Sequence, residues 1–324
     1  MDATPPEALR SIAPIMNRHG VKCTAEEFHA AVNVTFHEFE SEVYDQEHSD
    51  MWASLPRQFG LLVDDYFQTY PVPSGEFRLL DIGCGTGLAT QCILGTHFQG
   101  KISSITLLDT SPAMLRQASQ RASTWNIPCQ SRQGRLNDLP PGETYDLIIT
   151  CSVLHHIPDV GGFLEAVRCH QAGKGVFLHL QDPNGDYLHD PELRQRMSQV
   201  PREPKPNLVQ RALGRLYREL TGKQGDNYLI KTNKILLQKR FIETPLSPAE
   251  LYSITDFHVE NGEGISIRRM KDWMQDYTCL SQRAYGFFGT LWSNLPDPLK
   301  GIEEDLAVRN ALNGLHIGGV WTLR

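Results

Sequence analysis

The 324-residue chain is 40% hydrophobic and 21% charged, a composition typical of a folded globular protein. Its formal net charge of −7 argues against a general nucleic-acid binder. The sequence predicts no secretory signal and no membrane span, and its seven scattered cysteines predict free thiols in a reducing cytoplasm.

Residues 1–70 have the apolar spacing of helices, and prolines and a glycine at 71–75 end this region. Beyond it, short apolar runs alternate with segments long enough for one helix each. The runs span residues 77–82, 101–109, 144–152 and 175–182, and the helical segments span 88–95, 112–125 and 160–169. Near-continuous apolar strands that alternate with helices predict a doubly wound α/β domain, whose mostly parallel sheet is covered on both faces.

This alternation stops at residues 183–264, where prolines are frequent and residues 208–220 have a helical pattern. It resumes with expected helices at 265–275 and 302–312 and expected strands at 279–289 and 315–324. We therefore interpret 183–264 as a helical insertion into the α/β domain. Residues 190–240 carry twelve Lys or Arg and five Asp or Glu, a net charge of +7. This charge indicates either a solvated lid surface or a contact surface for an anionic substrate or carrier.

The strongest chemical signal is LLDIGCGTG at residues 79–87, an apolar strand that ends at an acid and turns through three glycines. Glycine permits positive φ and lets a ligand approach the backbone, and ligands bind at this end of the strands in open α/β sheets. A dinucleotide fingerprint needs a third glycine at position 88, which is Leu88. Asp81 beside the turn also suits a cationic amine better than a pyrophosphate.

This motif resembles the first motif of the class I S-adenosylmethionine (SAM)-dependent methyltransferases. The resemblance covers residues 35–182 well and 265–324 loosely. It implies a Rossmann-like fold with a seven-stranded sheet and an antiparallel last strand, with SAM as the cofactor and S-adenosylhomocysteine as the product. It also implies that Asp81 and the backbone around Gly83 and Gly85 hold the methionine part of SAM, with Gly87 as a further cofactor-binding residue.

The end of the second expected strand, LLDTSPAMLRQA, extends the resemblance. Asp109 is expected to accept hydrogen bonds from the ribose hydroxyls of SAM, with Thr110 beside it. Met114 is expected to pack on the adenine. The alternatives are a helix cap for Asp109 and a plain core position for Met114.

The family's G-D-A-x-x-L-P segment corresponds to GRLNDLP here, so that Arg135 replaces the acid. Adenine contacts are then expected from the backbone of Leu136, or from the side chain of Asn137 or Asp138. Cys151, at the end of the next strand, is expected to contribute its carbonyl group to SAM.

Five further residues are candidates for acting on the acceptor, four of them through the resemblance and Asp182 through its place at a strand end. His155 and His156 follow the strand that ends beside the methyl donor, and either could take a proton from a hydroxyl or amine. Tyr44 and His48 lie in a segment that resembles the lid of many small-molecule methyltransferases, where Tyr44 would contact the sulfonium. Asp182 ends another strand and is expected to hold or deprotonate the acceptor, or else to form a turn before Pro183.

These inferences predict an N-terminal helical lid at 1–70, a SAM-binding domain at 71–182 and 265–324, and a substrate cap at 183–264. The predicted activity is methyl transfer to a small-molecule acceptor, a metabolite or natural product. Three alternatives stay open: an RNA or protein methyltransferase that docks through the basic insertion, a SAM-binding protein without methyl transfer, and a nicotinamide-dependent dehydrogenase. No metal cluster is expected, because the adjacent His155 and His156 would point apart on an extended segment.

Overall fold

The computed structural model describes residues 6–70, 75–201, 228–260 and 264–324, which contain one seven-stranded sheet in the order β3-β2-β1-β4-β5-β7-β6. Its strands are β1 (Phe77–Ile82), β2 (Ile102–Asp109), β3 (Cys129–Gln133), β4 (Tyr145–Cys151), β5 (Gln171–Pro183), β6 (Tyr277–Tyr285) and β7 (His316–Leu323). The pairs among β1–β5 are parallel, whereas β7 runs antiparallel to both of its neighbours. The predicted fold class and the antiparallel last strand are therefore confirmed.

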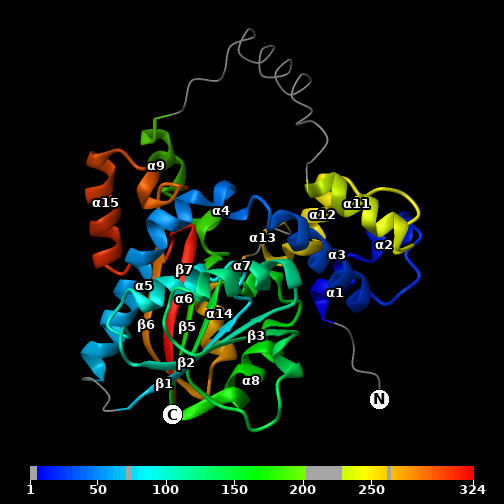
Figure 1. Ribbon diagram of the computed structural model, residues 1–324. Coiled ribbons are helices and arrows are strands. Elements are labelled where there is room, and N and C mark those ends of the chain that lie inside the picture. The colour runs from blue at the N-terminus through cyan, green and yellow to red at the C-terminus, as the bar shows by residue number, and fades with distance from the viewer. Residues whose placement is uncertain (1–5, 71–74, 202–227, 261–263) are drawn as a thin grey trace.

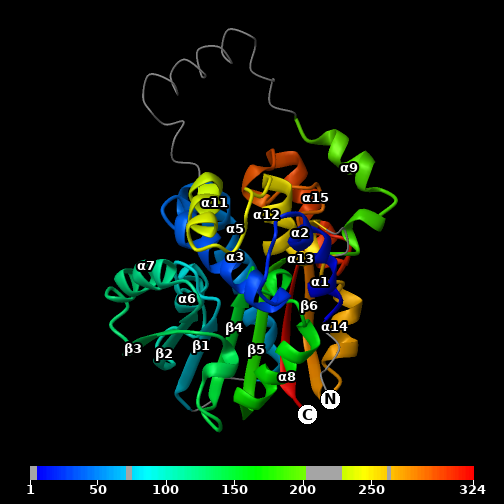
Figure 2. The same cartoon turned by 90° about the vertical axis from the view of Figure 1, so that its right-hand side faces the viewer.

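Helices cover both faces of this sheet (Figures 1 and 2). One core contains side chains of α5 (Ser49–Thr69), α6 (Leu88–Leu94) and α7 (Pro112–Ala122). The opposite core contains side chains of α8 (Val160–His170) and α14 (Ile267–Trp273). Leu79 and Leu80 are both fully buried but belong to opposite cores. Two-sided burial explains why the strands are continuous apolar runs in the sequence.

A separate helical layer joins the N-terminal region to the second half of the predicted insertion. Its members are α1 (Glu7–Ser11), α2 (Ala13–Arg18), α3 (Ala25–Glu40), α11 (Tyr228–Gln238), α12 (Pro248–Thr255) and α13 (Phe257–Glu260), which share one apolar cluster. Thr24 and Glu27 form a capping box that begins α3, and Ser247 and Glu250 form another that begins α12. Both views place this layer beyond one end of the strands (Figures 1 and 2).

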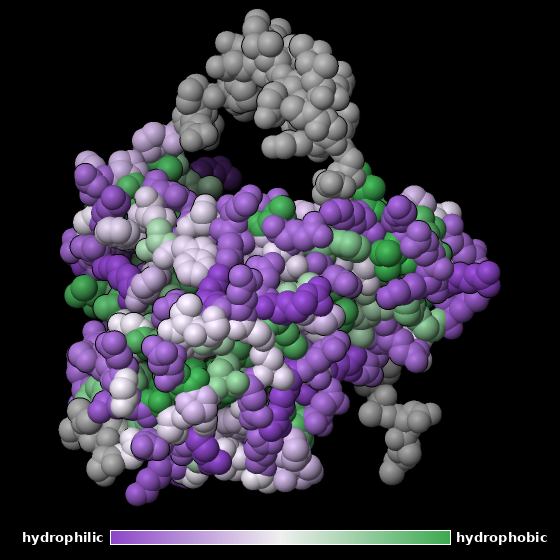
Figure 3. Space-filling view, in the orientation of Figure 1, coloured by the Kyte–Doolittle hydropathy of each residue, from purple (hydrophilic) through white to green (hydrophobic). Residues whose placement is uncertain are grey.

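The remaining helices are α4 (Tyr44–Glu47), α9 (Leu193–Gln199) and α15 (Asp297–Val308), with 3₁₀ turns η1 (Leu136–Asp138), η2 (Leu154–His156), η3 (Tyr187–His189) and η4 (Trp292–Asn294). The helical pattern expected at 208–220 lies outside the described residues. None of the helices in the described ranges combines the length and hydropathy that a bilayer crossing needs. Hydrophilic side chains cover much of the face seen in Figure 3, with small apolar groups between them.

Two elements show clear differences from the sequence-based expectation. The strand β3 was missed, because its sequence CQSRQ is polar and four of its five residues are exposed at the edge of the sheet. The helix α15 begins at Asp297 and not at residue 302, since a proline in its first turn is compatible with a helix start.

Candidate active site

The turn after β1 presents an open stretch of backbone. Gly83 and Gly85 both have positive φ, at 64° and 52°. A Cβ on Gly83 would lie 2.6 Å from a methyl group of Val153, so a side chain does not fit there. A Cβ on Gly85 would have no neighbour within 4 Å. The turn is therefore packed closely on one side and leaves free space over Gly85, which is where a ligand can reach the backbone.

Asp109, at the end of β2, holds this turn in place. Its Oδ2 accepts a hydrogen bond from the Gly85 N–H at 2.9 Å, and its Oδ1 accepts one from the Ser111 N–H at 2.8 Å. Burial raises the pKa of Asp109, although these two hydrogen bonds oppose that effect. A carboxylate offers about four lone-pair positions, so Asp109 can still accept bonds from a ligand.

Asp81 supplies a buried carboxylate oxygen without a partner in the described structure. Its side chain is fully buried, and Oδ2 accepts a hydrogen bond from the Thr90 hydroxyl at 2.6 Å. Oδ1 has no hydrogen-bond partner. Burial raises the pKa of Asp81 to about 7, although the hydrogen bonds from Thr90 lower it. An unpaired buried acceptor is costly, so this oxygen fits a ligand that brings an N–H or a positive charge.

The other predicted cofactor residues lie along the same end of the sheet. Gly87 is the N-cap of α6, Thr110 follows Asp109, Met114 is buried in α7, and Cys151 ends β4. In η1, Leu136 is buried, whereas Asn137 is exposed. The Asp138 carboxylate already accepts a hydrogen bond from the Arg135 N–H at 2.7 Å, which leaves Asn137 and Leu136 as the freer groups of that turn.

The structure corrects the expected arrangement of the two adjacent histidines. His155 and His156 lie in the turn η2 and not on an extended segment, and their ring centroids are 3.9 Å apart. The prediction that they point apart was therefore wrong, because a 3₁₀ turn sets successive side chains about 120° apart and not 180°. The two histidines are therefore close enough to be considered as ligands of one metal ion.

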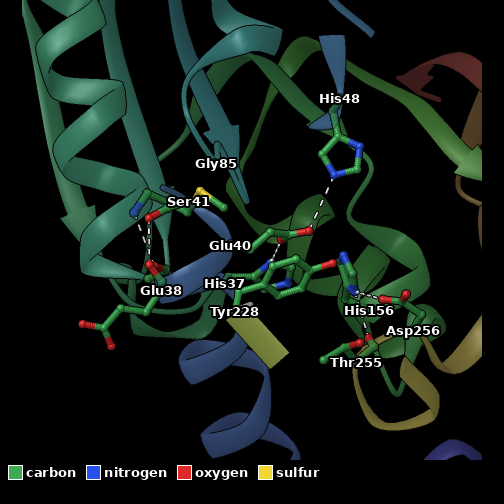
Figure 4. A network of polar contacts seen from close by, with 12 residues as sticks. His37, Glu38, Glu40, Ser41, His48, Gly85, His156, Tyr228, Thr255 and Asp256 are labelled. Atoms are coloured by element: carbon green, nitrogen blue, oxygen red, sulfur yellow. Dashed lines mark hydrogen bonds and ion pairs between the residues drawn. The ribbon is translucent and has the colours of Figure 1, made fainter. Parts of the chain in front are cut away.

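Each of these two histidines is held by a different acceptor. His155 Nδ1 lies 3.0 Å from Asp182 Oδ1, and Asp182 is fully buried at the end of β5. His156 Nδ1 lies 2.8 Å from the Thr255 carbonyl oxygen and 3.1 Å from Asp256 Oδ1 (Figure 4). Both Nδ1 atoms face acceptors, so each ring presents Nε2 as its free nitrogen.

The two histidines therefore differ in how readily each binds a proton and becomes positively charged. Burial and the neighbouring His156 lower the pKa of His155, although Asp182 opposes this. Burial also disfavours the charged form of His156, but Asp256 and the Thr255 carbonyl outweigh it and raise the pKa of His156. In turn, Asp256 has a pKa of about 2: burial raises it, but the hydrogen bond from His156 and the nearby positive charge lower it more. The pair of His156 and Asp256 thus resembles an oriented general base.

A second polar cluster lies on the N-terminal helices beside this pair. Glu40 is buried at the end of α3; its Oε2 lies 2.8 Å from His37 Nδ1, and its Oε1 lies 3.5 Å from His48 Nε2 (Figure 4). The ring of His37 packs edge-on against His156, with centroids 5.1 Å apart, and the ring of Tyr44 lies 4.5 Å from that of His48. The lid candidates Tyr44 and His48 therefore lie in a network that reaches His156.

The segment that carries Tyr44 is tied to the glycine turn. Arg121 of α7 donates to Asp45 Oδ2 at 2.6 Å and to the Thr86 carbonyl oxygen, and it stacks over Trp52 at 4.5 Å from the ring centroid. The Thr86 hydroxyl donates to Asp45 Oδ1 at 2.8 Å. We call Asp45, Thr86 and Arg121 the latch, because they join α4, the turn after β1, and α7.

Comparison with known proteins shows what the domain that carries these residues is similar to. A family model for a methyltransferase domain matches residues 80–177. The chain is similar to the ubiquinone biosynthesis O-methyltransferases of Paramagnetospirillum magneticum (28% identical over 106 residues) and of Rhodopseudomonas palustris strain HaA2 (32% over 108 residues). Each match covers 33% of this chain, and 41% and 37% of those proteins. The structure of the plantazolicin methyltransferase BpumL in complex with S-adenosylhomocysteine is similar with a TM-score of 0.44 at 13% identity, over 92% of this chain and 97% of that one.

Residues 80–177 therefore match a methyltransferase domain. The methyltransferase family predicted from the glycine motif is thereby confirmed for this segment. The chain spans about two fifths of the length of the curated relatives that it matches.

The methyltransferase domain contains only part of the candidate site. The cofactor candidates from Asp81 to Cys151 lie within it, as do His155 and His156. Sequence reasoning missed His37, Glu40, Thr255 and Asp256, all of which lie outside the matched segment. The spacing of His37 and Glu40 on one helix face could have indicated their pairing. No local pattern indicates that Asp256 reaches a residue a hundred positions earlier.

Proposed function

We propose that this chain transfers a methyl group from SAM to a hydroxyl-bearing small molecule. The observation that carries the proposal is the open glycine turn tied to Asp109, beside the unpartnered carboxylate oxygen of Asp81. The methyltransferase family model supports it, and the names of the similar O-methyltransferases favour oxygen as the methylated atom.

The residues at the end of the sheet fit SAM group by group. Asp81 has a free oxygen for the ammonium group, and Asp109 has free lone pairs for the ribose hydroxyls. The backbone of Gly83, Gly85, Gly87, Thr110 and Cys151 lies along the same strand ends, with Met114, Leu136 and Asn137 beside it for the adenine. When bound, SAM supplies a methyl carbon already activated by a sulfonium.

The protein then has to align the acceptor, remove its proton and exclude water. His156 is the group placed to accept the proton, since Asp256 and Thr255 orient its ring. His155, held by Asp182, lies beside His156, and Tyr44 and His48 lie in the network that joins the lid segment to His156. We assign residues 6–70 and 228–260 to a helical cover over the acceptor.

In the described part of the basic insertion, the charge distribution does not favour RNA or protein as the acceptor. Arg196 pairs with Asp190 and Glu192, and Lys231 pairs with Glu42, so acids of the same chain neutralise part of this charge. Six of its basic residues lie outside the described residues: Arg202, Lys205, Arg211, Arg215, Arg218 and Lys223. The transfer experiment described next therefore also includes RNA, protein and anionic small molecules as acceptors.

Calorimetric titration with SAM, S-adenosylhomocysteine and NADH tests the cofactor, and methyl-labelled SAM then tests transfer. We expect micromolar binding of the two adenosyl ligands and none of NADH. Label should transfer to members of a phenol and catechol panel, and not to RNA or protein. A folded protein that binds neither adenosyl ligand would contradict the proposal, and binding without any transfer would indicate a non-methylating role.

Replacing Arg121 with alanine should loosen the lid. It removes the ion pair to Asp45 and the contact with Trp52, which together are worth about 1–2 kcal/mol, or roughly tenfold in SAM dissociation rate. Hydrogen exchange should accelerate over residues 41–48. Arg116→Ala is the matched control, because Arg116 lies exposed on the same helix. Equal hydrogen-exchange rates over residues 41–48 in the two variants would show that the latch does not hold the lid in place.

A further inference from the structure

The turn η2 and the end of α12 bring together three groups that metals bind. His155, His156 and Asp256 each offer one ligand atom, and these atoms lie within 4.8 Å of one another. We propose that these three residues form a site for a divalent transition cation of the zinc class. Its place beside the acceptor rests on the proposed function, whereas the binding itself can be measured without SAM or acceptor.

The hydrogen bonds around the two rings select the nitrogen that a metal would use. His155 Nδ1 faces Asp182, and His156 Nδ1 faces the Thr255 carbonyl oxygen. Acceptors at both Nδ1 positions require N–H groups there, which leaves the Nε2 lone pairs for a ligand. A carboxylate or carbonyl behind each ligating histidine is the usual outer shell of a protein metal site.

The same place has an excess of acceptors. Asp182 is fully buried, and its Oδ2 has no hydrogen-bond partner in the described structure. The Asp256 carboxylate lies beside the same ring pair, with Oδ1 at 3.1 Å from His156 Nδ1. Two imidazoles close to two carboxylates attract a positive charge, and a metal ion supplies more of it than one proton does.

The donor set indicates which cation fits. Two imidazoles and one carboxylate suit Zn²⁺ and similar first-row ions, whereas Mg²⁺ and Ca²⁺ prefer an all-oxygen shell. Three protein ligands leave a fourth position for water or for the acceptor. A cation at this position would lower the pKa of an acceptor hydroxyl bound to it, and the proton would pass to solvent water as the O–H bond breaks. His156 would then serve as a ligand, and it accepts the proton itself only when the cation is absent. This arrangement favours acceptors that can place a hydroxyl or catechol oxygen on the metal.

The test is binding of Zn²⁺ and Co²⁺ to the untagged, chelator-treated full chain. We expect one Zn²⁺ per chain by calorimetry, with micromolar or tighter affinity, and Co²⁺ absorption bands of a four- or five-coordinate site. His156→Ala and Asp256→Ala should each weaken binding at least about tenfold, and Asp182→Asn should weaken it about 10–100-fold through His155. His97→Ala should leave it unchanged, because His97 is an exposed histidine on another part of the chain.

Two results would overturn the site. One is the absence of stoichiometric binding by folded protein. The other is binding that His156→Ala and Asp256→Ala leave intact, since it would show that other histidines bind the ion. A SAM titration of the same preparation separates this outcome from failure of the proposed methyl transfer.

Discussion

Replacing Asp109 with alanine should weaken SAM and S-adenosylhomocysteine binding by at least about 100-fold. The substitution removes the acceptor for the ribose and also frees the Gly85 and Ser111 N–H groups that position the turn. Hydrogen bonds to a charged group contribute about 1.5–3 kcal/mol each, so loss of one or two accounts for this factor. Calorimetric titration of the purified variant measures it.

Two further variants make this result specific. Asp305→Ala is the control, because Asp305 is exposed on α15, far along the chain from the glycine turn. Asp109→Asn keeps one oxygen acceptor and should bind with intermediate affinity. Circular dichroism has to show that each variant is folded. An Asp109→Ala protein that binds SAM as tightly as the Asp305→Ala protein would exclude Asp109 from the cofactor site.

Replacing His156 with glutamine should lower kcat about 10²–10⁴-fold at unchanged SAM affinity, since general-base catalysis contributes about that factor. The assay contains a chelator, so that only proton transfer is measured. His97→Gln is the control. Comparable loss in both variants, or no loss in either, would contradict a proton acceptor at His156.

The role of His156 as proton acceptor also predicts how the activity changes with pH. His156 accepts a proton only when neutral, and its pKa is raised above the usual value although burial opposes this. Activity should therefore rise with pH through that raised pKa and level off above it. Asp256→Asn removes the main cause of the upward shift, so the rising limb should move to lower pH. A limb that stays in place in Asp256→Asn would show that another group titrates.

Local sequence patterns determined the α/β scaffold and the cofactor turn. Continuous apolar runs predict strands buried on both faces, and LLDIGCGTG predicts a turn open to a ligand, because these properties depend on residues that are neighbours in the chain. The edge strand β3 was not predicted, because a polar strand that is exposed at the edge of the sheet has no run of apolar residues.

Only the tertiary structure decided which groups meet around His156. The Thr255 carbonyl oxygen that orients it lies 99 positions later, and Asp45 of the latch lies 76 positions before Arg121. The turn η2 also reversed the expectation for His155 and His156, because a backbone turn and not the sequence spacing sets where adjacent side chains point. Packing of α3 and α12 over the strand ends brings these distant residues together, and such packing depends on the sum of many burial terms that no short motif records.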